Sequence, residues 1–391
     1  MQTIGEVNIM KRLFAFIAAA LAANILTVPV SAVPDDVPPE LSAASAVVIN
    51  ADTLGVLYGK GESERRAMAS TTKIMTALLT LEAGDLDSRF TADSMAIRVE
   101  GTSMGLREGD IVTRRALVYG MLLPSGNDAA NAAAVSVAGS IPAFAELMNR
   151  RAAQLGMRDT HFVTPSGLDA NGHYTTAYDM ALLTAEALKN KDFREICSVR
   201  SATVEFGRPP EPRRLYNSNK LLAMYDGCIG VKTGFTDNAR RCLVSAAERE
   251  GCTLIAVTLN APDDWNDHKK LLDYGFERVK PYGVRIDSYS AEVVGGTADN
   301  VSAVPAESVT MGLTDEESKR LSVRYSLPEF VYAQVNAGDV LGHAEVRLDG
   351  RTVKRVPLVA YESVDRVIPP HGPFGRFITL FTGGAVRIRG I

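Results

Sequence analysis

The chain has 391 residues, which is too long for one ordinary domain and long enough for two with their own cores. Its hydrophobic content of 46% and charged content of 23% are typical of globular proteins, and its formal net charge of −4 leaves no basic surface for nucleic acid. We therefore expect no nucleic-acid partner. The histidines and cysteines follow no His-x-x-x-His or Cys-x-x-Cys spacing, so we expect no metal site either.

The first 32 residues have the pattern of an export signal. Lys11 and Arg12 precede an alanine-rich apolar run over 13–26, and Val30-Ser31-Ala32 is a small-residue cleavage site. The alternative is an uncleaved membrane anchor, although the apolar run is short for a membrane span. We therefore expect a signal peptide at 1–32 and a mature chain outside the cytoplasmic membrane.

Two strands, one at 46–49 and one starting at Val56, are expected before an apolar helix that opens at Ser70. Lys73 follows three residues later, so both side chains lie on one helical face. A serine hydroxyl becomes a nucleophile when a nearby base takes its proton, and a lysine serves as that base when burial or another cation lowers its pKa. Alone, this Ser-x-x-Lys pattern also fits an N-cap serine with a surface lysine.

A second polar cluster lies between two predicted helices, one over 113–123 and one over 129–137. There, Ser125 and Asn127 form a Ser-x-Asn loop that can project a hydroxyl and a carboxamide into a cleft. The alternative is an ordinary turn with helix-capping residues, which has the same sequence pattern.

A third cluster, Lys232-Thr233-Gly234, begins a predicted strand hairpin over 230–259. The glycine allows a substrate backbone to approach an ammonium and a hydroxyl.

Between the second and third clusters we expect a helix at 141–155, a turn-rich loop at 164–173 and a helix capped by Thr176. A last helix is expected at 263–279.

From about residue 285 short alternating strands replace the helical periodicity, apart from 314–320. Asp349-Gly350 is a two-residue hairpin signal. These features predict a small all-β domain at 285–365, followed at 370–391 by an aromatic, slightly basic tail that resembles an interfacial membrane anchor or a last packed element. The pairing of Cys197, Cys228, Cys242 and Cys252 stays open, with Cys228 and Cys242 as one pair to consider.

The three clusters occur in the order found in serine β-lactamases and penicillin-binding proteins. Together with Ser103-Met104-Gly105-Leu106, Gly167-Leu168-Asp169 and Phe235-Thr236, they resemble the low-molecular-mass serine D-alanyl-D-alanine carboxypeptidases, most closely the sporulation-type Gram-positive branch. The resemblance implies an α/β (α+β) penicillin-binding, serine β-lactamase-like domain over about 40–282. In such a domain helices flank an antiparallel sheet, and the small all-β domain follows it.

The resemblance also implies a reaction that needs no cofactor. Ser70 would attack the penultimate D-Ala carbonyl of a peptidoglycan stem peptide ending in D-Ala-D-Ala, and β-lactams would acylate the same serine. Lys73 would be the base and Ser125 a proton relay. The substrate-binding residues would be Asn127, Lys232, Thr233, Gly234 and Phe235, with the backbone N–H groups of Ser70 and Phe235 holding the oxyanion. Some relatives carry a carboxylate-binding arginine where this chain has Ser218, so Lys232 and Thr233 would take that task.

Three other functions share these residues. A D,D-endopeptidase would cleave crosslinked peptides with the same machinery. A β-lactamase of the commonest class would need a glutamate in the loop at 164–176, which has none. A wall-binding protein without activity would be expected to lose Ser70, Lys73 or Lys232, and all three are present.

Overall fold

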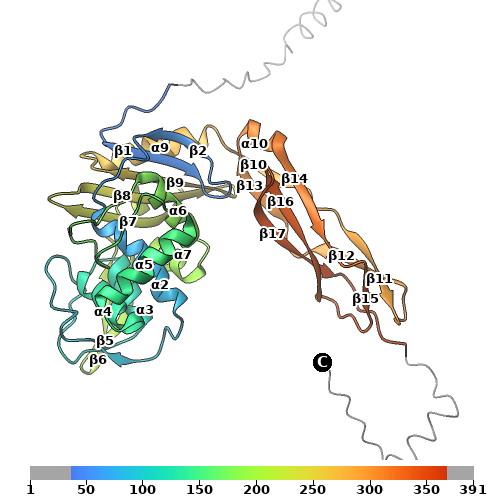
Figure 1. Ribbon diagram of the computed structural model, residues 1–391, viewed down its shortest axis with the longest axis horizontal. Coiled ribbons are helices and arrows are strands. Elements are labelled where there is room, and N and C mark those ends of the chain that lie inside the picture. Colours follow the sequence, from blue (N-terminus) through green and yellow to red (C-terminus); the bar gives the residue numbers. More distant parts are fainter. Residues whose placement is uncertain (1–36, 368–391) are drawn as a thin grey trace, which may run out of the picture. The chain divides into compact units, whose positions relative to one another are not determined.

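The computed structural model describes residues 37–367, so the expected signal peptide and the tail at 370–391 lie outside the described residues. Antiparallel strands form the centre of the first region, with the order β2-β1-β9-β8-β7. Their bounds are β1 (Ser45–Asn50), β2 (Val56–Lys60), β7 (Cys228–Thr236), β8 (Arg240–Arg249) and β9 (Cys252–Leu259). Strand β1 of the N-terminal hairpin therefore pairs with β9, about 200 residues later in the chain (Figure 1).

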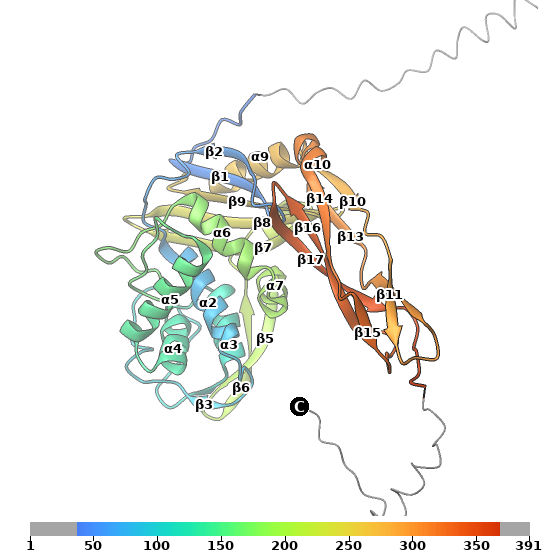
Figure 2. The same ribbon diagram turned by 45° about the vertical axis from the view of Figure 1, so that its right-hand side comes forward.

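Both faces of this sheet are covered, because alternate residues of β1 belong to two different cores. Val47 and Ile49 pack in the larger core with the helices on one face, whereas Val48 packs against Leu271 and Leu272 of α9 (Asp264–Phe276) on the other face (Figure 2). The larger group of helices comprises α2 (Lys73–Glu82), α3 (Arg114–Leu122), α4 (Asn127–Ala138), α5 (Ile141–Leu155), α6 (Ala177–Ala187) and α7 (Lys191–Ser198). This arrangement confirms the predicted antiparallel sheet flanked by helices.

Local sequence signals set most of the helix ends. Thr113, Ser140, Thr176 and Asn190 each accept a hydrogen bond from a first-turn backbone N–H, and Gly139 and Gly156 end their helices in the left-handed conformation. The reactive segment differs from the expected plain helix start. Ser70 lies in a 3₁₀ turn, η1 (Ala69–Thr72), and the α-helix begins at Lys73.

A second small sheet in this region contains a hairpin that the sequence did not indicate. Its order is β3-β4-β5-β6, with β3 (Phe90–Thr91), β4 (Ile111–Val112), β5 (Ser201–Gly207) and β6 (Pro210–Tyr216). Prolines, glutamates and arginines interrupt the apolar alternation of β6, so its pairing with β5 leaves little trace in the hydrophobic pattern. The short helix α8 (Leu221–Met224) follows it.

The second region is built from strands, as predicted. β10 (Lys280–Val284) pairs with β13 (Val309–Leu313), and the remaining strands form one sheet in the order β14-β16-β17-β12-β11-β15. Their bounds are β11 (Tyr289–Val294), β12 (Asn300–Pro305), β14 (Leu321–Ser326), β15 (Phe330–Tyr332), β16 (Val340–Leu348) and β17 (Arg351–Ala360). Its helix α10 (Asp315–Arg320) begins with a capping box formed by Thr314 and Glu317. The predicted Asp349-Gly350 turn joins β16 to β17 with both residues at positive φ.

All four cysteines are free thiols. Cys228 lies opposite Ala247 and Cys242 opposite Gly234, far apart on the β7–β8 ladder, so the pair considered from the sequence does not form a disulfide.

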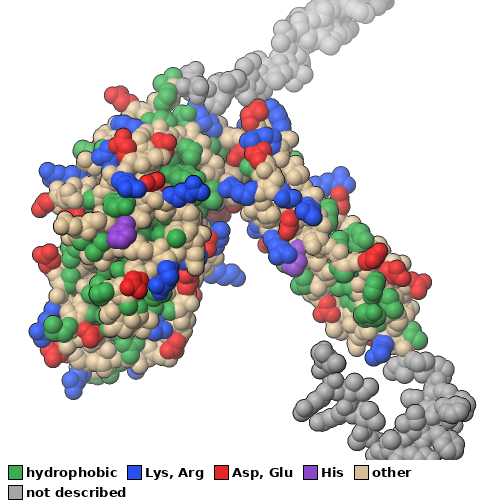
Figure 3. Space-filling view, in the orientation of Figure 1, with side chains coloured by type: hydrophobic (Ala, Val, Ile, Leu, Met, Phe, Trp, Pro, Cys, Tyr) green, Lys and Arg blue, Asp and Glu red, His purple; other side chains and the backbone are tan. Residues whose placement is uncertain are grey.

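Within residues 37–367 there is no cluster of metal-ligating side chains. No single helix there passes for a membrane span by length and apolar content, and α4 and α5 do so only as a pair bent by 84°. On the face shown in Figure 3, acidic and basic side chains are interspersed.

Candidate active site

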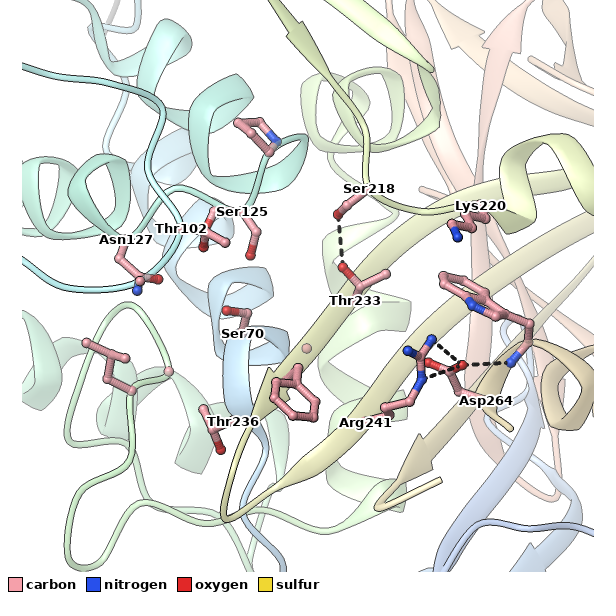
Figure 4. A pocket seen from close by; sticks show the side chains of 17 residues that line it. Ser70, Thr102, Ser125, Asn127, Ser218, Lys220, Thr233, Thr236, Arg241 and Asp264 are labelled. Carbon is pink, nitrogen blue, oxygen red and sulfur yellow. Dashed lines mark hydrogen bonds and ion pairs between the residues drawn. The ribbon is translucent and has the colours of Figure 1, made fainter. Parts of the chain in front are cut away.

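The three predicted clusters meet at one pocket of about 440 Å³ beside the free edge of β7. Ser70, Ser125, Asn127, Thr233, Gly234 and Phe235 all line it (Figure 4). Lys73 and Lys232 do not reach the pocket surface, because both are buried beneath it. The structure therefore brings together every predicted site residue, with six of them on the wall and two below.

Close backbone approaches hold Ser70 in place. Ala69 has a φ of 47°, in the left-handed region, which turns the chain just before the serine. A Cβ on Gly234 would lie 3.1 Å from the Ser70 backbone nitrogen, and a Cβ on Gly167 would lie 2.0 Å from the Ala69 carbonyl oxygen. Both glycines are needed because strand β7 and the loop around Gly167 pass directly against the serine turn.

Lys73 makes three hydrogen bonds that determine what its amine can do. Its Nζ lies 2.8 Å from Ser70 Oγ, 2.7 Å from Asn127 Oδ1 and 2.6 Å from the Ser166 carbonyl oxygen. The Asn127 carboxamide is oriented by its Nδ2, which donates to the Glu100 carbonyl at 2.7 Å. Asn127 Oδ1 and the Ser166 carbonyl only accept, so a neutral amine directs its two N–H bonds to them. Its lone pair then faces the Ser70 hydroxyl.

Burial favours this neutral form. Desolvation is the main cause that lowers the pKa of Lys73 well below its ordinary value, and the charge of Lys232 lowers that pKa further. Burial also lowers the pKa of Lys232, to about 7. The pair thus has the electrostatics expected of a lysine base beside a second cation.

Ser125 and the β7 residues form the rest of the reactive wall. Ser125 holds a φ of 67°, and its carbonyl accepts a hydrogen bond from Thr102 Oγ1 at 2.5 Å. Thr233 Oγ1 lies 3.0 Å from Ser218 Oγ, and both hydroxyls face the pocket in Figure 4. Lys232 Nζ donates to the Thr233 carbonyl oxygen at 2.8 Å. The Phe235 side chain is 59% exposed, so its ring is available to a bound molecule.

Asp128, which follows the Ser-x-Asn cluster, organises the opposite rim. Its carboxylate accepts hydrogen bonds from Ser103 Oγ and from the backbone N–H groups of Met104, Gly105, Leu106 and Ala129. The sequence contained both segments but gave no sign that one carboxylate joins them, since aspartate is also an ordinary helix-capping residue.

His173 supports the serine turn from below. Its Nδ1 accepts from the Val163 N–H at 2.9 Å, so Nε2 carries the proton and donates to Thr72 Oγ1, also at 2.9 Å. Thr72 Oγ1 in turn donates to the Ala69 carbonyl. Burial lowers the pKa of His173 to about 4, which keeps the ring neutral. Sequence reasoning missed this role, because the loop pattern showed His173 only as one polar residue among several.

Comparison with known proteins agrees with this geometry. A family model described as "D-alanyl-D-alanine carboxypeptidase" matches residues 32–263, and one described as "Penicillin-binding protein 5, C-terminal domain" matches residues 276–366. Bacillus subtilis D-alanyl-D-alanine carboxypeptidase DacF is 32% identical over 339 residues, covering 83% of this chain and 86% of DacF. Escherichia coli DacA, of the same enzyme name, is 32% identical and 97% of each chain is covered.

Solved structures show the same likeness. The Streptomyces K15 DD-transpeptidase is 34% identical with a TM-score of 0.58, covering 61% of this chain and 99% of its own. The D-alanyl-D-alanine carboxypeptidase DacD from Francisella tularensis is 25% identical with a TM-score of 0.60, covering 86% of this chain and 96% of its own. The first likeness is confined to part of the chain, whereas the second extends over most of it.

Proposed function

Because the chain belongs to the D-alanyl-D-alanine carboxypeptidase family, we propose that its serine peptidase activity removes the terminal D-Ala of peptidoglycan stem pentapeptides through an acyl-enzyme at Ser70. The observation that carries this assignment is the set of three contacts around Lys73 Nζ. Two of its partners can only accept hydrogen bonds, which directs the lone pair of the neutral amine at Ser70 Oγ.

In the acylation step, Lys73 takes the Ser70 hydroxyl proton while Oγ bonds to the penultimate D-Ala carbonyl carbon. The oxyanion lies between the backbone N–H groups of Ser70 and Phe235. Thr233 binds the terminal carboxylate through its hydroxyl, and Lys232 adds charge from beneath it. Asn127 orients Lys73 and binds the peptide amide. The bond between the carbonyl carbon and the terminal D-Ala nitrogen then breaks.

The leaving nitrogen receives its proton from the Lys73 ammonium through the Ser125 hydroxyl. This transfer returns Lys73 to its neutral form, so the same amine accepts a proton from the water that hydrolyses the Ser70 ester. Glu100, Thr102 and Gly167 contribute backbone and side-chain contacts rather than chemistry. No step calls for a cofactor.

The assignment extends to β-lactams, which present a strained amide to the same serine and carry a carboxylate beside it. A D,D-endopeptidase and a β-lactamase use the same residue types, but no observation on this chain favours either. The loop at 164–176, which contributes the Ser166 carbonyl to Lys73, contains no glutamate that could activate a deacylating water.

Intact-protein mass after incubation with benzylpenicillin tests the acyl-enzyme. The wild-type protein should gain a long-lived adduct of one penicillin and release D-Ala from a peptide ending in D-Ala-D-Ala, whereas Ser70→Ala should do neither. Penicillin left intact with no adduct would remove Ser70 as the nucleophile, and rapid penicillin consumption without an adduct would indicate a β-lactamase.

We further propose that the protein works at the outer face of the cytoplasmic membrane, exported by residues 1–32 and held at the membrane surface by residues 370–391. The support is the sequence pattern of these two segments together with a substrate that lies in the cell wall. Fractionation of the full chain and of a chain ending at residue 367 tests the tail. Equal membrane recovery of both would exclude it as the anchor.

A further inference from the structure

The carboxylate-binding end of the pocket contains a lysine with no assigned role. Lys220 lines the pocket two residues after Ser218, whose hydroxyl contacts Thr233 Oγ1. Figure 4 shows Ser218 and Thr233 between Ser70 and Lys220. A bound peptide that places its scissile carbonyl at Ser70 and its terminal carboxylate at Thr233 would therefore point that carboxylate toward Lys220.

Lys232 is poorly placed to meet this carboxylate directly. The residue is 1% exposed and is not among those that line the pocket, and its Nζ lies behind Thr233, 2.8 Å from the Thr233 carbonyl oxygen and 3.5 Å from Thr233 Oγ1. Burial also lowers the pKa of Lys232 to about 7, so near neutral pH a fraction of these side chains is uncharged. A carboxylate that leaves water for this pocket needs a cation that can reach it.

Arg241 is the other basic residue on the pocket wall, and it already has an anionic partner. Its Nε and Nη2 donate to Asp264 Oδ1 at 3.0 and 2.8 Å, and its guanidinium lies over the Trp265 ring. Asp264 is almost fully buried, so this ion pair has no net charge to offer a ligand. The Lys220 side chain, by contrast, belongs to an exposed residue and makes no hydrogen bond or ion pair with any other residue among 37–367.

The segment that carries Lys220 is held firmly. Asn217 Nδ2 donates to the carbonyls of Cys197 and Val199, the Ser218 N–H donates to the Leu123 carbonyl, and Asn219 Oδ1 accepts from the Leu221 N–H. The Cα atoms of Ser218 and Lys220, two residues apart, are separated by at most about 7 Å, which is comparable to the length of a lysine side chain. The backbone is thus fixed while the ammonium is free to move toward Thr233.

We infer that Lys220 is the cation that recognises the free carboxylate of the substrate's terminal residue, and that it makes the enzyme selective for peptides with a free C-terminus. This inference rests on the proposed carboxypeptidase function. Lys220 acts by binding and takes no part in proton transfer. The same contact would serve the carboxylate of a β-lactam.

The test compares D-Ala-D-Ala peptides with a free carboxylate against the same peptides with a C-terminal amide, and benzylpenicillin against its methyl ester. Lys220→Gln should lower kcat/KM for the free acid about tenfold, mainly through KM, and lower penicillin acylation by a similar factor. The amide and the methyl ester should react as with the wild type. Lys220→Arg should stay within about threefold of the wild type, because it keeps the charge.

Two matched controls separate charge recognition from structure. Lys191→Gln removes an exposed lysine outside this pocket and should change nothing. The double variant Arg241→Gln, Asp264→Asn removes the neighbouring ion pair without a change of net charge, and it should keep the preference for the free acid. Thermal unfolding of the Lys220 variants should match the wild type, since the Lys220 side chain has no hydrogen bond or ion pair to lose.

The outcomes are distinct. An active wild type with Lys220→Gln unchanged on the free acid overturns the inference alone, and so does an equal loss on acid and amide substrates. If the double variant loses the preference for the free acid while Lys220→Gln keeps it, Arg241 and not Lys220 would be the residue that recognises the carboxylate. A wild type that neither releases D-Ala nor forms a penicillin adduct overturns the proposed function together with this inference.

Discussion

Polar side chains are buried throughout the first region and almost nowhere in the second. Two lysines, two histidines and several aspartates and asparagines lie in the interior between residues 45 and 268, whereas Glu317 is the only buried polar residue among 280–367. Glu317 belongs to a helix capping box, so even this exception is structural. The strand region is stabilised by apolar packing, whereas the first region also buries Lys73 and Lys232 at a cost in stability, and this burial lowers the pKa values of the two amines at its reactive site.

Replacing Lys73 should give the largest effect and separate these two properties. Lys73→Met keeps the volume but removes the base, so kcat/KM should fall about a thousandfold. The free energy of unfolding should change by no more than about 2 kcal/mol. The variant avoids the desolvation cost of the buried amine, and this gain offsets the cost of leaving two oxygen acceptors without their donor. D-Ala release and urea unfolding measure the two quantities.

Leu78→Met provides the control, since Leu78 is a buried residue on the same helix. It should leave kcat/KM within about twofold of the wild type. A Lys73→Met protein that keeps more than a tenth of the wild-type kcat/KM would remove Lys73 as the base.

The opposite result is expected in the strand region. Leu358 on β17 is fully buried in the core of that region, so Leu358→Ala should cost about 3 kcal/mol of unfolding free energy through a cavity. Its kcat/KM should equal that of the wild type at a temperature where both are folded. Differential scanning calorimetry and an activity assay on the same sample decide this, with Leu358→Met as the volume-matched control. Lost activity in folded Leu358→Ala would mean that the regions are functionally coupled.

Acid should destabilise the first region selectively. Burial lowers the pKa of His173 to about 4 and that of His268 to about 3, whereas both titrate near 6.5 in the unfolded chain. As the pH falls below 6.5 the unfolded state binds protons that the folded state does not, so the free energy of unfolding falls. His173 alone contributes a loss of about 1.6 kcal/mol between pH 6.5 and pH 5.

Urea unfolding at these two pH values, with wild type and His173→Gln, measures that contribution. The variant should be less stable at pH 6.5, because Val163 N–H and Thr72 Oγ1 lose a well-placed partner. Its stability should nevertheless depend less on pH than that of the wild type. An identical pH dependence would mean that His173 is not held neutral in the folded protein.

The sequence allowed the strands of the main sheet, the capped helices and the Ser70, Ser125 and Lys232 clusters to be predicted, because periodicity and capping depend on residues close together in the chain. The roles of Asp128 and His173 were missed, because each depends on which groups lie across a gap of 20 to 100 residues. The orientation of the Lys232 side chain could not be predicted for the same reason. Its spacing from Thr233 and Gly234 was clear, but only the packing shows that its amine is buried behind Thr233, near the carbonyl and hydroxyl oxygens of that residue.

The smallest expected effect tests whether the end of β7 needs its link to the neighbouring loop. Thr236 Oγ1 donates to Asp169 Oδ1 at 3.0 Å and accepts from the Ala239 N–H at 3.0 Å. This connects the strand that carries Thr233 to the loop that supplies the Ser166 carbonyl. Thr236→Val should cost about 1 kcal/mol and raise KM severalfold with little change in kcat, because the binding strand loosens while Lys73 and Ser70 keep their contacts.

Ser322→Ala is the matched change in the strand region, where the Ser322 hydroxyl donates to the Arg347 carbonyl at 3.4 Å on an exposed strand. That variant should alter neither stability nor KM measurably, because water replaces the lost partner. Steady-state kinetics and thermal unfolding of both variants provide the comparison. Two results would contradict this expectation: an unchanged KM for Thr236→Val, or an equal loss of unfolding free energy in Thr236→Val and Ser322→Ala. Either result would mean that the polar contacts of the first region are no more functional than those of the second. The difference between the regions would then be confined to the buried lysines.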